Sequence, residues 1–253
     1  MKSLQKDLLK VRVFKTRDDL GKDAAELAAD AINKLLETES YINMIFAAAP
    51  SQNDFFEHIV KKNIDWERIN AFHMDEYVGL ESDAPQGFGN FLKDKIFSKV
   101  KFKTVNYING QAQDLEKECK RYEDLLKQFP PHIVCMGIGE NTHIAFNDPH
   151  VADFEDPKLL KIVDLDKACR IQQVNDGCFA TIDKVPEYAL TLTIPALIRG
   201  KEIFCMVPGK TKANAIKLTL SEDIKKEYPS TILRRHNSAV LFVDQDSYSL
   251  VEL

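Results

Sequence analysis

Short runs of apolar residues alternate along this chain with longer segments in which apolar residues recur every three or four positions. A short apolar run is typical of a buried strand, and the longer recurrence is typical of a helix packed on one face. Residues 133–136 show the first pattern, and residues 18–36 show the second through Leu20, Ala24 and Leu27. The strands predicted from these runs are residues 11–14, 41–46, 66–74, 102–108, 133–136, 160–164, 190–194, 203–207 and 238–243.

The predicted helices fall between the predicted strands. They are residues 18–36, 53–60, 90–98, 114–127, a helix that follows 208–212 and runs to about 220, and a last short helix capped by Ser230. This alternation predicts an α/β fold, namely a doubly wound, mostly parallel, Rossmann-like sheet with right-handed crossovers and helices on both faces. The chain contains no internal repeat, low-complexity stretch or linker, so residues 1–253 are expected to form a single domain.

The stretch 133–149 carries the highest density of chemically active side chains. Gly137 and Gly139 end the apolar run, and four polar residues follow within a short distance: Glu140, Asn141, His143 and Asp148. Open α/β sheets bind their ligands at the carboxyl ends of strands, which is where this loop is expected to lie. The alternative is a polar surface loop with one solvated histidine.

Asp75 and Glu76 form a second candidate group directly after the predicted strand 66–74. Adjacent side chains at a strand end point in different directions, so one carboxylate can act chemically while the other is structural. A solvated acidic turn is the alternative interpretation. An active site is a better interpretation than a solvated turn, because several loops with polar side chains are expected at one edge of the same sheet.

Two further segments are candidates for binding an anion. Ser51 follows a strand and is predicted to cap the helix that begins near residue 53, with Asp54 three positions later. A helix amino terminus offers free N–H groups to an anion, although an ordinary capped helix explains the pattern equally well. Residues 209–211 (Gly-Lys-Thr) are not a P-loop, because Phe204 occupies the position that requires a glycine. Lys210 and Lys212 are either anion ligands or solvated surface charges.

Composition narrows the class of protein. The 253 residues are 44% hydrophobic, enough for a large core, and the net charge of −5 is not concentrated in the basic stripe of a nucleic-acid-binding protein. No secretion signal or membrane-spanning run is recognised, so a soluble cytoplasmic protein is expected. The five scattered cysteines contain no C-x-x-C pair and no zinc pattern. Cys135 and Cys205 lie in apolar strand-like runs, which predicts buried free thiols in a reducing compartment. The five cysteines are Cys119, Cys135, Cys169, Cys178 and Cys205.

Residues 74–80 (Met-Asp-Glu-Tyr-Val-Gly-Leu) and 137–149 (Gly-Ile-Gly-Glu-Asn-Thr-His-Ile-Ala-Phe-Asn-Asp-Pro) together resemble the glucosamine-6-phosphate deaminases, over nearly the whole chain. The 6-phosphogluconolactonases are more distant members of that superfamily. The resemblance implies conversion of glucosamine 6-phosphate and water to fructose 6-phosphate and ammonia. It implies no metal or organic cofactor, a small sugar-phosphate substrate and a possible homo-oligomer.

The resemblance also implies roles for individual residues. Asp75 aligns with the general base that moves a proton from sugar C2 to C1. His143 aligns with the ring-opening histidine, flanked by Asn141 and Asp148. The family usually has Asp and Glu at those flanking positions. Asn141 therefore brings no charge, and Asp148 is one methylene shorter.

The resemblance in the phosphate loop is weaker. Residues 48–52 (Ala-Ala-Pro-Ser-Gln) replace a glycine-containing loop, with Ser51 and Gln52 as the expected phosphate contacts. Lys212 matches the phosphate lysine of the family. The phosphate arginine is missing near residues 176–178, and Arg170 is its nearest replacement in the sequence.

Several functions stay open. The leading prediction is an amino-sugar-phosphate deaminase/isomerase. The alternatives are an enzyme acting on galactosamine 6-phosphate, a sugar-phosphate lactonase, and a sugar-phosphate-binding protein without turnover. Release of ammonia separates the enzymes acting on amino sugars from the binding protein.

Overall fold

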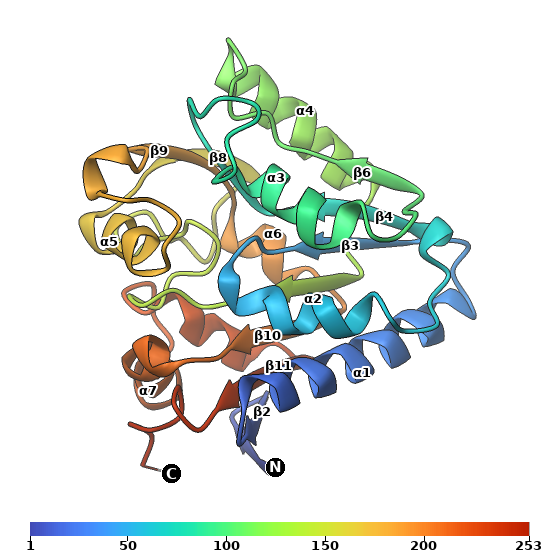
Figure 1. Ribbon diagram of the computed structural model, residues 1–253, viewed down its shortest axis with the longest axis vertical. Helices are drawn as coiled ribbons and strands as arrows, with labels where there is room; N and C mark the ends of the chain where they lie inside the picture. Colours follow the sequence, from blue (N-terminus) through green and yellow to red (C-terminus); the bar gives the residue numbers. More distant parts are fainter. Residues whose placement is uncertain (253) are drawn as a thin grey trace.

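The computed structural model describes residues 1–252, and its main feature is a sheet of eight strands (Figure 1). All neighbouring strands run parallel except β1 and β2, which are antiparallel at one edge. In spatial order the strands are β1 (Lys2–Lys6), β2 (Leu9–Phe14), β11 (Ala239–Asp244), β10 (Glu202–Val207), β7 (Ile133–Met136), β3 (Ile42–Phe46), β4 (Ile69–His73) and β6 (Thr104–Asn106). The predicted mostly parallel sheet is confirmed.

A second sheet of three antiparallel strands was not anticipated. It consists of β5 (Asp75–Tyr77), β9 (Tyr188–Leu192) and β8 (Leu160–Asp164), in that order. The chain passes from β4 of the main sheet to β5 of the small sheet through one residue, Met74. The apolar runs predicted β8 and β9 as strands, but their pairing depends on segments far apart in the sequence.

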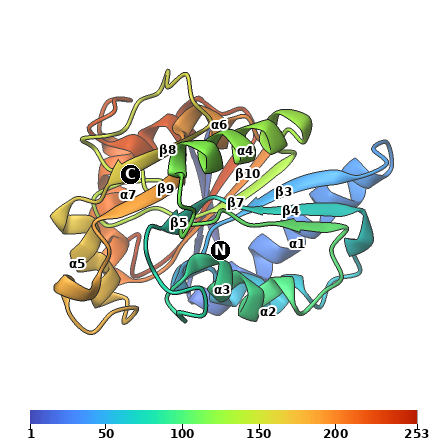
Figure 2. The same ribbon diagram turned by 90° about the horizontal axis from the view of Figure 1, so that it is seen from above.

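Helices cover both faces of the main sheet, as predicted (Figure 2). Helices α1 (Arg17–Leu36), α2 (Asn53–Ile59) and α3 (Phe88–Leu92) pack on one face, and α4 (Leu115–Gln128), α6 (Ile194–Ile198) and α7 (Ala213–Ser221) pack on the other. Helix α5 (Lys167–Asn175) lies beside the small sheet, beyond one end of the main sheet. A π-helical turn, Lys93–Phe97, continues α3, and single 3-10 segments are Pro50–Gln52, Trp66–Arg68, Ile182–Lys184, Lys210–Lys212 and Pro229–Arg235.

Side chains of the central strands alternate between two cores. On β3, Met44 and Phe46 pack with the α1 and α2 residues, whereas Ile45 packs with residues of the opposite face. On β7, Cys135 faces the first core and Val134 the second. Burial on both faces explains why these strands read as continuous apolar runs. It also confirms Cys135 as a buried free thiol.

Some predicted boundaries were wrong for identifiable reasons. Trp66–Arg68 forms a helical turn before β4, where a continuous strand was predicted. Helix α5 was missed because its sequence, Lys-Ala-Cys-Arg-Ile-Gln-Gln-Val-Asn, has little apolar periodicity. Strand β1 was missed because it is a mostly polar edge strand. Within residues 1–252 no helix has both the length and the apolar character to cross a bilayer.

Strands from both ends of the sequence pair directly, since β2 is hydrogen-bonded to β11. The two ends of the described part of the chain therefore lie in one sheet, which supports the proposal of a single domain.

Helices α1 and α2 approach closely at Gly21. A Cβ atom at this position would lie 2.6 Å from the Cβ of Asp54. Asp54 in turn accepts a hydrogen bond from Nε of Arg17 at 2.7 Å. Glycine is therefore required here by packing, although it costs helix stability.

Gly21→Ala is expected to lower the free energy of unfolding by about 1–3 kcal/mol, because overpacking outweighs the roughly 1 kcal/mol that alanine gains in a helix interior. Urea unfolding measures the change. Lys22→Ala, at the next and exposed position of α1, reports the effect of alanine without the contact. If the free energy of unfolding of Gly21→Ala equals or exceeds that of the wild type, α1 and α2 can move apart at no cost, and the packing argument is wrong.

Candidate active site

A cavity of about 600 Å³ opens at the carboxyl edge of the main sheet. Its wall is built from the segments that follow β2, β3, β4, β7 and β10, together with the end of α5. Strands β3 and β7 lie side by side, and later strands are added outward from them in opposite directions. Such a switch point is where open α/β sheets bind ligands.

Asp75 reaches the cavity from the junction between the two sheets. The hydroxyl of Tyr122 accepts a hydrogen bond from N of His73 at 3.2 Å and donates one to its carbonyl at 2.8 Å, which fixes the end of β4. Asp75 then pairs with Thr191 in the small sheet. Burial, and secondarily the charge of Glu76, raises the pKa of Asp75 well above its usual range. A carboxylate in this environment is a stronger base than a solvated one.

Glu76 has a structural role. Its carboxylate accepts hydrogen bonds from the N–H groups of Tyr77, Phe88 and Gly89 at 2.9, 3.0 and 2.8 Å. The bonds from Phe88 and Gly89 hold the first turn of α3. Burial raises the pKa of Glu76 despite the three hydrogen bonds, which lower it.

The loop after β7 is tightly folded. The N–H of Gly139 donates to O of His143 at 2.9 Å, and Thr142 and Ala145 have positive φ angles of 71° and 48°. A Cβ atom on Gly139 would lie only 2.2 Å from Nε2 of His143, so glycine allows the imidazole its position. Two hydrogen bonds that involve side chains connect the loop to β9. The first runs from Asn147 Nδ2 to O of Leu192 at 2.8 Å. Backbone strain of this kind is concentrated at functional sites.

The second bond to β9 runs from N of Phe146 to Oγ1 of Thr191 at 3.0 Å. Thr191 is the backbone partner of Asp75 in the small sheet. The loop that carries His143 and the strand that carries Asp75 are therefore fixed to the same residue.

His143 lines the cavity, while Asn141 and Asp148 contact its ring from behind. Nδ1 of His143 lies 2.7 Å from Oδ1 of Asn141 and 3.0 Å from Oδ1 of Asp148. Burial alone would raise the pKa of Asp148, but its hydrogen bonds and the charge of His143 outweigh burial and lower it. The predicted cluster of these three side chains is present.

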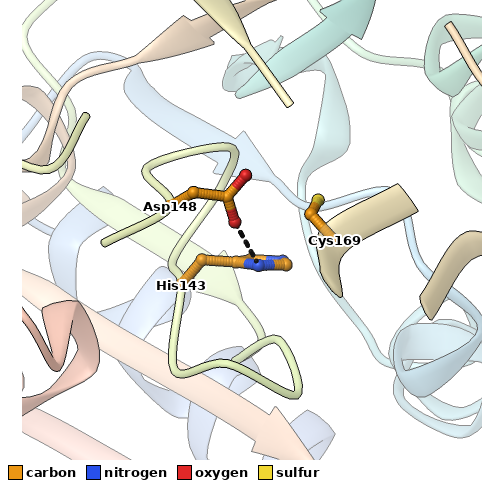
Figure 3. A group of neighbouring side chains, drawn as sticks. All are labelled: His143, Asp148 and Cys169. Atoms are coloured by element: carbon orange, nitrogen blue, oxygen red, sulfur yellow. Dashed lines mark ion pairs between the residues drawn. The ribbon is translucent and has the colours of Figure 1, made fainter. Parts of the chain in front are cut away.

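Cys169 of α5 lies beside Asp148 and His143 (Figure 3). Donor atoms of the three side chains lie within 4.8 Å of one another, a spacing that would suit a metal ion. Each side chain is already engaged, because the thiol bonds to Asp148 and Asp148 bonds to His143. We assign them to one hydrogen-bonded network. Burial, followed by the nearby carboxylates, raises the pKa of Cys169.

Ser51 lines the cavity but does not cap α2. It lies within the 3-10 turn Pro50–Gln52, and its hydroxyl accepts a hydrogen bond from Gln52 Nε2 at 3.0 Å. The N-cap residue of α2 is Gln52, whose side chain makes no capping hydrogen bond to the helix. Asp54, predicted to complete the cap, instead binds Arg17. The predicted capping box was therefore wrong, because a proline-led turn precedes the helix.

Gln52 lies behind the cavity wall. Its amide donates to the carbonyls of Met136 and Met206, both at 3.3 Å, and its side chain is fully buried. It joins the ends of β7 and β10. The prediction that Gln52 contacts a phosphate does not fit this position.

Lys212 is a buried cation in the cavity wall. Burial lowers its pKa, and the charges of Asp176 and Glu140 oppose this change. The structure shows no hydrogen bond or ion pair of its ammonium group with any residue in 1–252. The turn before it is fixed by Gly209, whose φ of 98° favours glycine and whose N–H donates to Asp244 at 3.0 Å. A buried ammonium without such a partner is suited to bind an anion.

Arg170 does not reach the cavity. Its guanidinium donates to the carbonyls of Ile182 and Val185, both at 2.9 Å, so it joins α5 to the following turn. Arg17 lines the cavity instead, held by Asp54 and by O of Pro50 at 3.1 Å. Sequence reasoning missed Arg17, although its position just after strand β2 was a usable signal.

Gln172 and Gln173 were also missed. Both are buried on α5 and line the cavity. Oε1 of Gln172 accepts the N–H of Glu140 at 2.7 Å, which connects α5 to the histidine loop. Because α5 was not predicted, no signal in the sequence placed these amides at the site.

Comparisons with known proteins identify the family of this chain. A model of the family described as glucosamine-6-phosphate isomerases/6-phosphogluconolactonase matches residues 15–242. Glucosamine-6-phosphate deaminase from Bacillus cereus is 32% identical over 242 residues, covering 96% of this chain and 89% of the relative. The Bacillus thuringiensis enzyme of the same name gives the same identity and coverage.

Solved structures show the same fold. A monomeric glucosamine-6-phosphate deaminase superposes with a TM-score of 0.85 at 29% identity, covering 95% of this chain and 99% of the other. The 6-phosphogluconolactonase of Thermotoga maritima superposes with a TM-score of 0.75 at 21% identity, covering 92% and 98%, which is similarity of fold alone. With a family match over most of its length, this chain belongs to the glucosamine-6-phosphate isomerase/6-phosphogluconolactonase family.

Proposed function

We propose that this protein is an amino-sugar-phosphate deaminase/isomerase, which converts glucosamine 6-phosphate and water to fructose 6-phosphate and ammonia. The observation that carries this proposal is the combination of Asp75, His143 and the buried ammonium of Lys212 in the wall of one cavity. The relatives at 32% identity are deaminases for glucosamine 6-phosphate, which favours this substrate over its galactose epimer.

Ring opening is the first step, and His143 performs it. Its Nδ1 edge is held by Asn141 and Asp148, so the Nε2 edge is the one available for proton exchange. A proton passes to the ring oxygen as the C1 hydroxyl loses its own, which gives the open-chain aldehyde. A histidine suits this step because its ring exchanges protons near neutral pH.

Proton transfer between C2 and C1 follows, with Asp75 as the base. The carboxylate removes the C2 proton to give an enolamine and returns a proton to C1, leaving an imine at C2. Water then adds to C2 and ammonia leaves, so atoms balance. The structure shows no hydrogen bond to the Asp75 carboxylate from residues 1–252, which leaves the carboxylate free for the substrate.

The phosphate group is bound by Lys212 and Ser51, with Arg17 as an additional cation. A phosphate neutralises the buried ammonium of Lys212 and so offsets the cost of burying it. Its remaining oxygens accept hydrogen bonds from the Ser51 hydroxyl and the Arg17 guanidinium. Self-association, expected from the resemblance, stays a prediction that sedimentation can measure.

The decisive experiment measures ammonia released from glucosamine 6-phosphate and, separately, from galactosamine 6-phosphate. Faster release from the first supports the proposal, and faster release from the second reverses the choice of epimer. Binding of either sugar without ammonia would support a binding protein. Hydrolysis of 6-phosphogluconolactone without ammonia release would support a lactonase.

Asp75→Asn is expected to reduce ammonia release by at least about a hundredfold, because an amide cannot accept the C2 proton. Thermal unfolding should be preserved, since the change is isosteric. Asp83→Asn, the same substitution at an exposed position of the nearby loop, should retain activity. Near-normal release by Asp75→Asn would remove this residue from the mechanism.

Lys212→Ala is expected to raise KM about tenfold or more with a smaller effect on kcat, because a phosphate contact far from the reacting carbons mainly supplies binding. Lys217→Ala, at an exposed position of α7, serves as the matched control. Steady-state kinetics measure both constants. An unchanged KM would place the phosphate elsewhere.

The acidic limb of the pH profile of kcat/KM should reflect Asp75. The base must be ionised, and its pKa is raised by burial and by the charge of Glu76. Activity should therefore appear only above the usual aspartate range of about 4. Glu76→Gln removes the like charge and should move the limb to lower pH, provided that thermal unfolding confirms a folded protein. A limb that does not move would show that another group controls it.

A further inference from the structure

A second carboxylate, Asp166, lies next to the Asn141 and Asp148 side chains that contact the ring of His143. Asp166 is the N-cap residue of α5, where its Oδ1 accepts the N–H of Cys169 at 2.6 Å. Its other oxygen, Oδ2, accepts a hydrogen bond from Nδ2 of Asn141 at 3.0 Å. Its own N–H donates to Oδ2 of Asp148 at 3.2 Å. One residue thus joins the helix, the amide and the carboxylate that face His143.

These bonds determine which way the Asn141 amide points. Its NH₂ group donates to Oδ1 of Asp148 at 2.9 Å and to Oδ2 of Asp166 at 3.0 Å. The reverse orientation would place the amide oxygen against two carboxylates. The oxygen therefore faces His143, where it accepts from the backbone N–H at 3.1 Å and contacts Nδ1 at 2.7 Å. An oxygen at Nδ1 requires a hydrogen on that nitrogen.

We propose that Asp166 is a positioning residue that acts on His143 through Asn141. By accepting one of the two amide hydrogens, Asp166 keeps Oδ1 of Asn141 on Nδ1 of His143, where it joins Oδ1 of Asp148 at 3.0 Å in holding the hydrogen on Nδ1. Nε2 is then free to exchange a proton with the sugar ring oxygen. This inference rests on the ring-opening role proposed above.

The same arrangement explains how asparagine can stand at position 141. The negative charge that Asn141 lacks is present on Asp166, one hydrogen bond further from the imidazole. Donor atoms of Asp148 and Asp166 lie within 4.8 Å of each other, and the Asn141 NH₂ group bridges them. A carboxylate at position 141 would place a third negative charge there without any bridging hydrogen.

Asp166→Asn separates the positioning role from helix capping. Asparagine caps helices as well as aspartate does, and its single oxygen can still accept from Cys169. Its NH₂ group then faces the NH₂ group of Asn141, so the bond between the two side chains is lost. We expect kcat to fall about tenfold to a hundredfold with KM changed less than about threefold, because Asp166 does not touch the substrate.

Asp114→Asn is the matched control. Asp114 caps α4 through the N–H of Lys117 at 3.0 Å, and it takes no part in the site. It should leave both kinetic constants unchanged. If Asp166→Asn behaves like Asp114→Asn, the positioning role is refuted.

Exchanging the two side chains supplies a rescue. Asn141→Asp alone should lose activity, because three carboxylates then meet without a bridging NH₂ group. In the double variant Asn141→Asp/Asp166→Asn, the amide of residue 166 donates to the carboxylate of residue 141, so the bond between these two side chains is restored in reverse, although the bond from residue 141 to Asp148 is not. The double variant should be at least about tenfold more active than either single variant, a coupling that independent sites do not show. Multiplicative losses would overturn the proposal.

The tautomer of His143 can be measured without enzymatic turnover, so this test of the positioning role does not depend on the proposed function. ¹⁵N spectra of histidine-labelled protein, recorded at alkaline pH where imidazoles are neutral, identify the nitrogen that carries hydrogen. The His143 signals are assigned by their loss in His143→Gln. The wild type should show hydrogen on Nδ1, and Asp166→Asn should raise the fraction with hydrogen on Nε2, because only Asp148 then still accepts from Nδ1.

The two failures therefore differ. A wild type that releases no ammonia, but in which Asp166→Asn shifts the tautomer, refutes the proposed function and supports the positioning role. An active wild type whose tautomer and kcat are both insensitive to Asp166→Asn refutes the positioning role alone.

Discussion

The pairing of β3 with β7 in the middle of the main sheet is the constraint on which the site depends. Both strands are buried on both faces, and the N–H of Ala47 continues the ladder by donating to O of Cys135 at 2.9 Å. Because later strands extend outward from this pair, the loops beyond it diverge and leave a cavity between them. Hydrophobic burial thus fixes where charged and polar groups meet.

The parts of the fold predicted from sequence are those with a local signal. Buried strands and amphipathic helices follow from period and length, and loops at strand ends follow from chain order. The antiparallel pairing of β5 with β9 has no local signal, because the partners lie far apart in the sequence. Helix α5 lacked a clear apolar stripe, so the prediction missed the wall that carries Gln172 and Gln173.

The sequence predicted which residue types form the candidate site, but it did not predict where all of their side chains point. Asp75, His143, Ser51 and Lys212 line the cavity as expected. Gln52 and Arg170 do not, because each side chain binds backbone carbonyl groups elsewhere. Neighbours in sequence cannot reveal such partners. The effect of Asn141 was likewise unpredictable, since Asp166 reaches it from another element.

The junction between the two sheets has a mechanical consequence. Asp75 belongs to the small sheet, whereas His143 follows a strand of the large one. Their spacing therefore depends on the seam where the two sheets meet. This seam is closed by the hydrogen bond from N of Leu192 to O of Met74 at 2.8 Å and by the bond from Asn147 Nδ2 to O of Leu192. Any sliding along this seam would change the distance between the proposed base, Asp75, and His143. The alignment of the two proposed catalytic steps is thus a property of how rigidly the two sheets are joined, and of no single loop.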